Sequence, residues 1–324
     1  MTEELQRMYT EHPGKVSDKW SVYLEKYDSA FNDYKDKAIC LLEIGVQNGG
    51  SLEVWSRFFP NARKIIGCDI NQQCALLEYE DPRISVVAGD ANTDDTQAVV
   101  LQKASLFDVI IDDGSHVSGD IVRSFARYFP VLEDGGIFIV EDLHCSYWQE
   151  YEGGLFYPFS SMSFFKRITD IINYEHWGTT KKPSDIFGGF SKEYQFEISD
   201  EILQHIHSIE FINSMCIIKK RMTSQNKLGA RIIAGSIDTV VPGLIDLHLT
   251  QTPTPTQTDN KWTARGIAPD EELLVLLTEL TECNKQISAL NKTITDIQSS
   301  LSWRITRPLR IAANKVRSIK NPSA

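Results

Sequence analysis

The chain has 324 residues, 42% of them hydrophobic and 24% charged, as is usual for a soluble globular protein. The net charge of −11 disfavours a nucleic-acid-binding body. The sequence opens Met-Thr-Glu-Glu, without a basic and apolar signal pattern, and contains no long apolar run, so we expect a cytoplasmic protein. The six cysteines include no CxxC pair and predict reduced thiols.

The first 35 residues are polar with regularly spaced aromatic residues. Steps of three and four positions predict a helical face that packs at the edge of a sheet. The alternative is that residues 18–20 (Asp-Lys-Trp) reach a bound ligand. The aromatic residues of this face are Trp20, Tyr23, Tyr27, Phe31 and Tyr34.

A glycine turn follows the first predicted strand, an apolar run at 38–42. Gly45, Gly49 and Gly50 allow a sharp turn and a close ligand, and Ser51 caps the next helix. The spacing Glu43-x-Gly45-x-x-x-Gly49 is not the dinucleotide fingerprint, and its acid suits a cationic ligand better than pyrophosphate. It resembles motif I of class I methyltransferases, which bind S-adenosylmethionine; a generic α/β turn is the alternative.

Further strands are predicted at 64–69, 84–90, 107–112 and 136–140, with a helix end and turn at 130–136. Alternating strands and helices predict a parallel sheet. Two closing strands at 206–212 and 215–218 form an antiparallel pair, as in class I methyltransferases. The fold class is therefore α/β: a doubly wound, mostly parallel, seven-stranded, Rossmann-like sheet. Residues 145–190 are irregular and aromatic, with a helix at 163–177, and we interpret them as a lid or substrate wall.

Two acids end the second and third strands. Asp69 lies at the distance from the glycine turn at which an acid binds ribose hydroxyls, although an ordinary strand exit has the same form. Asp90 flanks the adenine in the methyltransferase pattern and equally caps the following helix; these two interpretations are compatible.

Acids and histidines follow the fourth and fifth strands. Carboxyl ends of neighbouring parallel strands share one edge, where α/β proteins bind ligands. Clustered carboxylates require a cation, and oxygen ligands suit Mg²⁺ or Ca²⁺, while a nearby imidazole suits a general base. Helix capping explains one or two of these groups but not all six. They are Asp112, Asp113, His116, Glu141, Asp142 and His144.

Three motifs, at 42–46, 111–116 and 140–148, resemble the metal-dependent sugar O-methyltransferases of macrolide biosynthesis, of the mycinamicin and tylosin type. The resemblance covers about residues 14–220. It implies a Mg²⁺-dependent S-adenosylmethionine O-methyltransferase that acts on a sugar hydroxyl of a glycan or glycosylated metabolite. Residues 47–50 depart from the family's glycine turn, and residues 150–200 are not closely covered, so the substrate does not carry over.

The resemblance also implies residue roles. Asp113, Glu141 and Asp142 would hold Mg²⁺. His116 would be the base, with His144 as the rival candidate. The residues implied for the S-adenosylmethionine site are Glu43, Gly45, Gly49, Asp69, Asp90 and Asp112.

The chain after the methyltransferase domain (1–221) changes character. Residues 222–269 are polar and contain a Thr-Pro-rich linker, and residues 270–302 carry an apolar heptad pattern that predicts a coiled coil and a homo-oligomer. A solitary amphipathic helix is the alternative. The seam consists of Leu273, Leu276, Leu280, Cys283, Ile287, Leu290, Ile294, Ile297 and Leu301.

The tail (303–324) is basic and resembles the Ser-Trp-Arg tails of bacterial surface-polysaccharide enzymes. It contains no acid, so it suits an anionic membrane surface or an assembly partner; a solvated tail is the alternative. A membrane-binding tail would make the protein peripheral to the inner face of the membrane. Two rival functions remain: an NAD-linked enzyme, disfavoured by the missing fingerprint, and a non-catalytic coiled-coil adaptor of a glycan-assembly complex.

Overall fold

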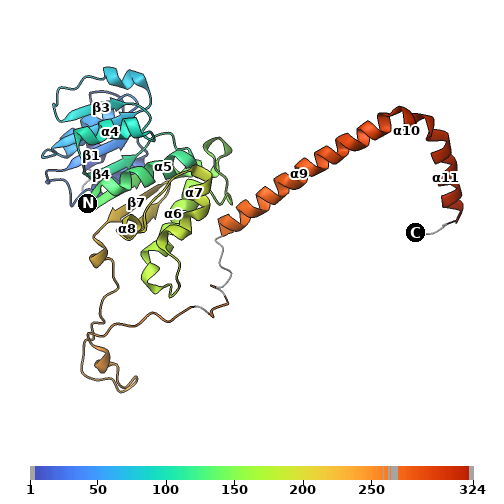
Figure 1. Cartoon of the computed structure of the whole chain (residues 1–324). Helices are drawn as coiled ribbons and strands as arrows, with labels where there is room; N and C mark the ends of the chain where they lie inside the picture. Colours follow the sequence, from blue (N-terminus) through green and yellow to red (C-terminus); the bar gives the residue numbers. More distant parts are fainter. Residues whose placement is uncertain (1–3, 258, 262, 264–268, 321–324) are drawn as a thin grey trace. The chain divides into compact units, whose positions relative to one another are not determined.

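The computed structural model of the chain describes residues 4–257, 259–261, 263 and 269–320 (Figure 1). It comprises two units, Met1–Ala268 and Pro269–Ala324. Within the described residues, none of the helices combines the length and the hydropathy needed to cross a bilayer.

The first unit is built on a single sheet with the spatial strand order β3-β2-β1-β4-β5-β7-β6. The first five strands pair in parallel, whereas β7 runs antiparallel to β5 and to β6. The predicted doubly wound, seven-stranded α/β sheet is therefore confirmed. The strands are β1 (Cys40–Ile44), β2 (Lys64–Asp69), β3 (Ile84–Ala88), β4 (Phe107–Asp112), β5 (Leu132–Val140), β6 (Ile206–Ile212) and β7 (Met215–Lys220).

Strand β5 begins earlier than the sequence suggested. Leu132 already pairs with Phe107, and the register shifts between Phe107 and Val109 before regular pairing resumes. Gly135 has a φ of 80°, which glycine tolerates readily. The irregular register thus accommodates a glycine-containing segment whose composition is typical of a turn.

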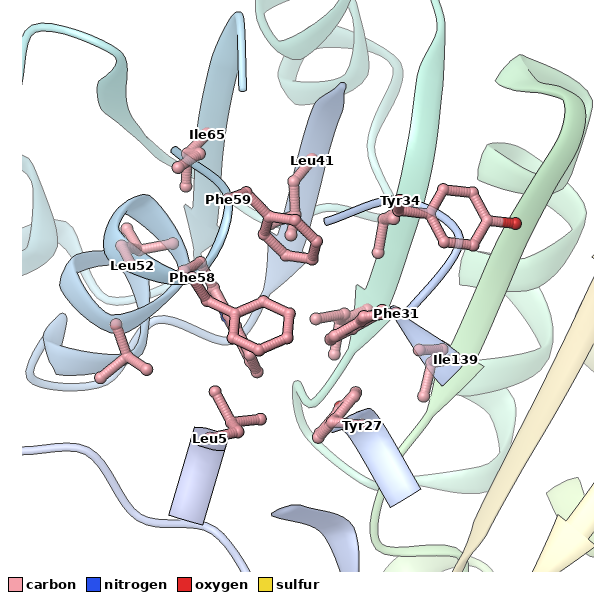
Figure 2. Packing of buried hydrophobic residues seen from close by; sticks show 14 of the residues in the cluster. Leu5, Tyr27, Phe31, Tyr34, Leu41, Leu52, Phe58, Phe59, Ile65 and Ile139 are labelled. Atoms are coloured by element: carbon pink, nitrogen blue, oxygen red, sulfur yellow. The ribbon is translucent and has the colours of Figure 1, made fainter. Parts of the chain in front are cut away.

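Three helices cover one face of the sheet: α1 (Glu4–Thr10), α2 (Ser21–Ala30) and α3 (Gly50–Phe58). Figure 2 shows Phe31 beside Phe58 and Phe59, below the strand residue Leu41, and Tyr27 stacks on Phe31. The rings of Phe31 and Phe59 lie 5.1 Å apart, edge to face. The N-terminal aromatic face therefore packs on the face of the sheet and not at its predicted edge, except for Trp20, which stays exposed.

Another set of helices covers the opposite face: α5 (Ser118–Tyr128), α6 (Ser161–Ile172) and α7 (Gly188–Tyr194). Phe125 of α5 packs against Phe138 of β5, which alternates with the strand residues that face the first layer. Phe164 of α6 stacks on Phe187 at 4.2 Å. Much of the predicted lid is therefore a core-forming layer, and its helix ends at Ile172.

Helix α4 (Asp94–Lys103) lies beside α5: Gln97 Nε2 donates to Arg127 O at 2.9 Å, and Arg127 Nη1 donates to the Asp94 carboxylate. The other elements of the first unit are the short helix α8 (Asp200–Leu203) and the 3₁₀ helices η1 (Gln72–Leu76), η2 (Phe129–Val131), η3 (Leu143–Tyr147), η4 (Gln149–Tyr151), η5 (Tyr174–His176), η6 (Pro183–Phe187), η7 (Thr223–Gln225) and η8 (Ile245–Leu247).

The segment after β7 returns to the body of the first unit. Leu228 N donates to the Glu175 carboxylate, Thr254 Oγ1 donates to the Glu175 carbonyl, and Gln257 N donates to Gly178 O at 2.9 Å. Both ends of the segment 228–257 of the predicted linker are therefore hydrogen bonded to the loop that follows α6.

The second unit contains α9 (Pro269–Ser299), α10 (Leu301–Ile305) and α11 (Arg307–Lys320). Ser300 is extended, with ψ of 149°, and its side chain accepts a bond from Trp303 N, which caps α10. The long helix thus ends at Ser299, and Leu301 of the predicted seam lies in α10. The Leu273 side chain lies outside the described residues; the other seam side chains are exposed on α9.

Candidate functional site

The glycine turn joins β1 to α3 and brings two parts of the backbone into close approach. Gly45 has a φ of 92°, and a Cβ there would lie 2.0 Å from the carbonyl oxygen of Asp113. Gly49 has a φ of 85°, and its Cβ would lie 2.2 Å from Tyr79 Oη. Only glycine fits both positions, so the turn passes directly beside the end of β4.

A cavity of about 270 Å³ opens at this edge of the sheet. The glycine turn, Asp69 and Asn71 form one side, and the groups that follow β4 and β5 form the other. Residues 16–20 complete the lining. The groups on the second side are Asp113, Gly114, His116, Glu141 and Asp142.

A second cavity of about 170 Å³ shares Gly45, Asp69 and Gly114 with the first. Asp90 and Asp112 line it. The two cavities together follow the carboxyl ends of β1 to β4, which is where an elongated nucleoside ligand binds in an open α/β sheet.

Asp69 fastens the glycine turn to β2. Its Oδ2 accepts hydrogen bonds from Val46 N at 2.7 Å and Gln47 N at 2.9 Å, and its Oδ1 accepts one from Asn71 N. Asp69, which is predicted to bind ribose, therefore also stabilises the glycine turn.

The predicted cofactor acids differ in their surroundings. Glu43 is fully buried, accepts a bond from Ser51 Oγ at 2.6 Å and lies 3.5 Å from Lys19 Nζ. Asp90 accepts a bond from Asn92 N, as a turn cap does. Asp112 is buried beneath the second cavity, and desolvation raises its pKa to about 7. Glu43 is therefore buried next to the glycine turn and does not line either cavity, whereas Asp90 and Asp112 line the second cavity.

Lys19 enters the acid cluster from the N-terminal segment. Its ammonium lies 2.5 Å from Asp113 Oδ2 and 2.7 Å from Glu141 Oε1, and the side chain is only 2% exposed. Burial lowers the lysine pKa, but the charges of Glu141, Asp113 and Glu43 outweigh burial and raise the pKa well above its ordinary value. The alternative in which residues 18–20 reach the ligand site is thus supported, because all three line the cavity.

Glu141 is held at the base of the cluster. Tyr27 Oη donates to its Oε1, the same oxygen that contacts Lys19. Burial and the neighbouring charge of Asp113 raise the pKa of Glu141 above its usual range. The Oε1 atom of Glu141 is therefore bound by two protein groups, Lys19 and Tyr27.

Asp142 stands at the centre of the exposed part of the site. Trp20 Nε1 and Tyr23 Oη donate to its Oδ1 at 2.9 and 2.8 Å. His116 Nε2 lies 3.6 Å from its Oδ2. Among the described residues, one atom each of Asp113, His116 and Asp142 lie within 4.8 Å of one another and could share a metal ion. Glu141, which the resemblance implied as the third ligand, is not in this group, whereas His116, implied as the base, is. The two carboxylates suit a hard divalent cation, and the imidazole suits a general base beside it.

The two candidate bases have different settings. His116 lines the main cavity in a left-handed backbone conformation with φ of 60°. His144 Nδ1 is hydrogen bonded to Ser214 Oγ, and the same nitrogen lies 3.9 Å from Asp142 Oδ1. The geometry favours His116 as the group with a nitrogen directed into the site; the assignment of either role stays a prediction.

Three supporting residues escaped the sequence prediction as site residues. Tyr23 and Tyr27 were assigned to a packing face, and their rings do pack, but their hydroxyls bind the acids. Ser214, at the turn between β6 and β7, binds both Tyr23 and His144. The only available signal was the tyrosine hydroxyls on an otherwise apolar helical face.

The strand order with its reversed β7, the glycine turn after β1 and the acids after β4 and β5 together define the Rossmann-like fold of class I methyltransferases. No protein-family model matches the chain.

Among solved structures, one crystal form of the MycE methyltransferase from the mycinamycin biosynthetic pathway, in complex with Mg and SAH, is similar over 74% of this chain and 56% of that chain. The TM-score is 0.55 and the identity 25%.

Two curated relatives carry the sequence resemblance. A rhamnosyl tetracenomycin-C 2'-O-methyltransferase of Streptomyces olivaceus is 32% identical over 52% of this chain and 47% of its own length. Mycinamicin VI 2''-O-methyltransferase of Micromonospora griseorubida is 34% identical over 46% of this chain and 39% of its own length. The chain thus matches about half the length of these relatives or less. The resemblance to sugar O-methyltransferases drawn from the motifs is confirmed.

Proposed function

We propose that the chain is a Mg²⁺-dependent S-adenosylmethionine O-methyltransferase that acts on a sugar hydroxyl. The observation that carries this proposal is the single cavity that joins the glycine turn and Asp69 to Asp113, His116 and Asp142. A methyl donor and a metal-bound acceptor must meet within such a space. The similarity to MycE in complex with Mg and SAH supports the same pairing.

The donor side of the cavity suits a cationic nucleoside. The glycine turn admits a ligand close to the backbone, and Asp69 and Asp90, which line the cavities, would bind ribose and flank adenine. The acids on the opposite side favour a positive sulfonium over an anionic pyrophosphate. Asp112, in the second cavity, would border the adenine.

The acceptor side suits Mg²⁺. Asp113, Glu141 and Asp142 would supply the carboxylates. Lys19 binds one oxygen of Asp113 and, together with Tyr27, one oxygen of Glu141, so the other oxygen of each would bind the ion. When bound, the ion would lower the pKa of a coordinated sugar hydroxyl and hold it in place.

His116 would then accept the hydroxyl proton at Nε2, and Asp142, 3.6 Å away, would stabilise the imidazolium that forms. S-adenosylmethionine, when bound, would supply the methyl group, and the imidazole of His116 would hold the proton that the acceptor hydroxyl loses. The protein residues mainly align donor and acceptor, which contributes about 7 kcal/mol or more in favourable cases.

Binding and turnover test this proposal. Calorimetry should show S-adenosylmethionine binding to the full chain, and turnover should require a divalent cation. Binding of NADH with no binding of S-adenosylmethionine would overturn the proposal. Cofactor binding without transfer to any glycan would favour the non-catalytic adaptor instead.

We also propose that the acceptor is a glycan or a glycosylated metabolite, with a surface polysaccharide favoured by the basic tail. Loss of a methyl-sized mass increment from surface glycans after gene deletion would identify such a substrate. An unchanged glycan mass spectrum, together with turnover on a small glycoside, would instead assign the activity to a metabolite.

The second unit supplies the proposed assembly functions. The exposed seam of α9 would be covered by a second copy, which gives a homo-oligomer. In the tail, the Arg310 guanidinium lies 3.6 Å from the centre of the Trp303 ring, and residues 301–324 carry basic side chains without an acid. This chemistry suits an anionic membrane surface or an assembly partner, and would place a cytoplasmic protein at the membrane periphery.

A further inference from the structure

Five rings follow one another from Trp20 to His116, and the two rings at the ends of this row line the main cavity. The centroids of consecutive rings lie 6.0 Å (Trp20 to His144), 5.0 Å (His144 to Trp148), 6.1 Å (Trp148 to Tyr151) and 6.4 Å (Tyr151 to His116) apart. We call this row, Trp20–His144–Trp148–Tyr151–His116, the aromatic rim.

Three members of the aromatic rim lie beside one carboxylate. Trp20 Nε1 donates to Asp142 Oδ1, His116 Nε2 lies 3.6 Å from Oδ2, and His144 Nδ1 lies 3.9 Å from Oδ1. Trp148 is joined to this group through its ring contact with His144.

The two tryptophans of the aromatic rim are unusually open to solvent. Trp20 is 58% exposed and Trp148 47% exposed, whereas Trp55 in the core is fully buried. Large aromatic side chains gain stability mainly by burial, so two half-exposed indoles beside an acid cluster indicate a surface that a ligand covers.

The backbone holds Trp148 in place. Its N–H donates to Cys145 O at 2.9 Å, and its carbonyl accepts bonds from Tyr151 N and Gly153 N at 3.1 and 3.0 Å. The ring therefore stands on a fixed turn between η3 and η4, and a ligand would meet a preformed surface.

The neighbouring charges restrict the chemistry of that ligand. Asp113, Glu141 and Asp142 disfavour an anionic acceptor, while exposed indole faces suit an apolar surface. A neutral pyranose combines both requirements, because its C–H groups form an apolar face and its hydroxyls project from the ring edge.

We propose that the aromatic rim is the acceptor subsite, in which Trp148 stacks on the C–H face of a neutral pyranose and directs its hydroxyls toward Asp142 and His116. This inference rests on the proposed function and adds to it the residue that selects the sugar ring. Trp20, whose indole N–H is bound to Asp142, lies on the other side of His144 in the same row of rings.

Saturation-transfer NMR on the full chain with SAH and MgCl₂ tests the subsite. The probes are methyl α-L-rhamnopyranoside and methyl α-D-glucopyranoside. Ring C–H protons of at least one probe should receive saturation in the wild type. Trp148→Ala should lose this transfer, Trp148→Phe should retain most of it, and Phe211→Ala, at an exposed ring of β6, should behave as the wild type.

If the protein transfers a methyl group to one of these probes, steady-state kinetics should rank the variants in the same order. KM for the probe should rise on the order of tenfold in Trp148→Ala. The affinity for SAH should stay unchanged, which also shows that the variant is folded. Equal transfer or equal KM in Trp148→Ala, or no saturation of any probe by the wild type, would overturn the subsite. Absence of SAH and Mg²⁺ binding in the wild type would instead overturn the proposed function.

Discussion

Lys19 Nζ lies 2.7 Å from Glu141 Oε1, and both side chains are 2% exposed. The same ammonium contacts Asp113, so a residue of the N-terminal segment neutralises acids that follow two different strands. Without this lysine, several carboxylates would face one another with little solvent. The N-terminal segment is therefore part of the site.

The variant Lys19→Met should strongly lower the free energy of unfolding. Removal of one partner of a buried ion pair typically costs about 3–5 kcal/mol. Lys15→Met is a matched control on the same segment, because Lys15 pairs with Glu53 at 2.6 Å but is 29% exposed, where such pairs contribute about 1 kcal/mol or less. Urea denaturation measures both, and equal losses would show that the buried cluster does not depend on Lys19.

Asp142→Asn should weaken metal binding by at least about tenfold and leave S-adenosylmethionine affinity nearly unchanged. Asparagine is the appropriate replacement because Asp142 has a φ of 55°, a conformation that asparagine tolerates. Calorimetry with MgCl₂ and with the cofactor separates the two effects. Full turnover in excess EDTA would show that the acids serve only the structure.

His116→Asn should reduce methyl transfer by about 10²–10⁴-fold, the usual contribution of general base catalysis, with folding retained. Asparagine again suits the left-handed backbone. His144→Asn should have a smaller effect, since Ser214 occupies its Nδ1. If the His144 variant were inactive and the His116 variant active, His144 would be the general base instead of His116.

Asp112 should make the protein less stable as the pH rises from about 4 to about 7. Its pKa is raised to about 7 in the folded chain by desolvation, from 3.8, so the folded state binds more protons than the unfolded state across this window. The loss is at most about 1.4 kcal/mol per pH unit for one group and ends above pH 7. Asp112→Asn should flatten this slope in ligand-free denaturation experiments, and an unchanged slope would assign it to other groups.

Removal of the second unit from Pro269 onward should convert an oligomer into a monomer. The seam residues Leu276, Leu280 and Ile287 are about half exposed or more in α9, and their burial by a partner helix would supply the association energy. Sedimentation of the full and shortened chains measures this. A full-length monomer at micromolar concentration would show that the seam has a different partner.

The sheet could be predicted because each strand is a short apolar run with a polar exit, and this signal is local. The site acids at 113, 141 and 142 were found for the same reason, since the exits of adjacent parallel strands meet at one edge. The early start of β5 could not be predicted, because a shift in strand register leaves no mark in composition.

The supports of the acids were harder to predict. Tyr23 lies 119 positions from Asp142 and Tyr27 lies 114 positions from Glu141. A helical aromatic face predicts burial whether or not its hydroxyls have partners. Only the three-dimensional fold shows that these rings both pack in the core and bind the site.

The contacts between Lys19 and Glu141 and between Trp20 and Asp142 each span 122 positions. Contacts of such sequence separation form only after the chain between them has been ordered, since loop closure costs entropy that nearby contacts must first offset. During refolding, the sheet should therefore appear before the assembled acid cluster. A chain that has formed its strands but in which Lys19 and Trp20 have not yet reached the acids would be compact and unable to react.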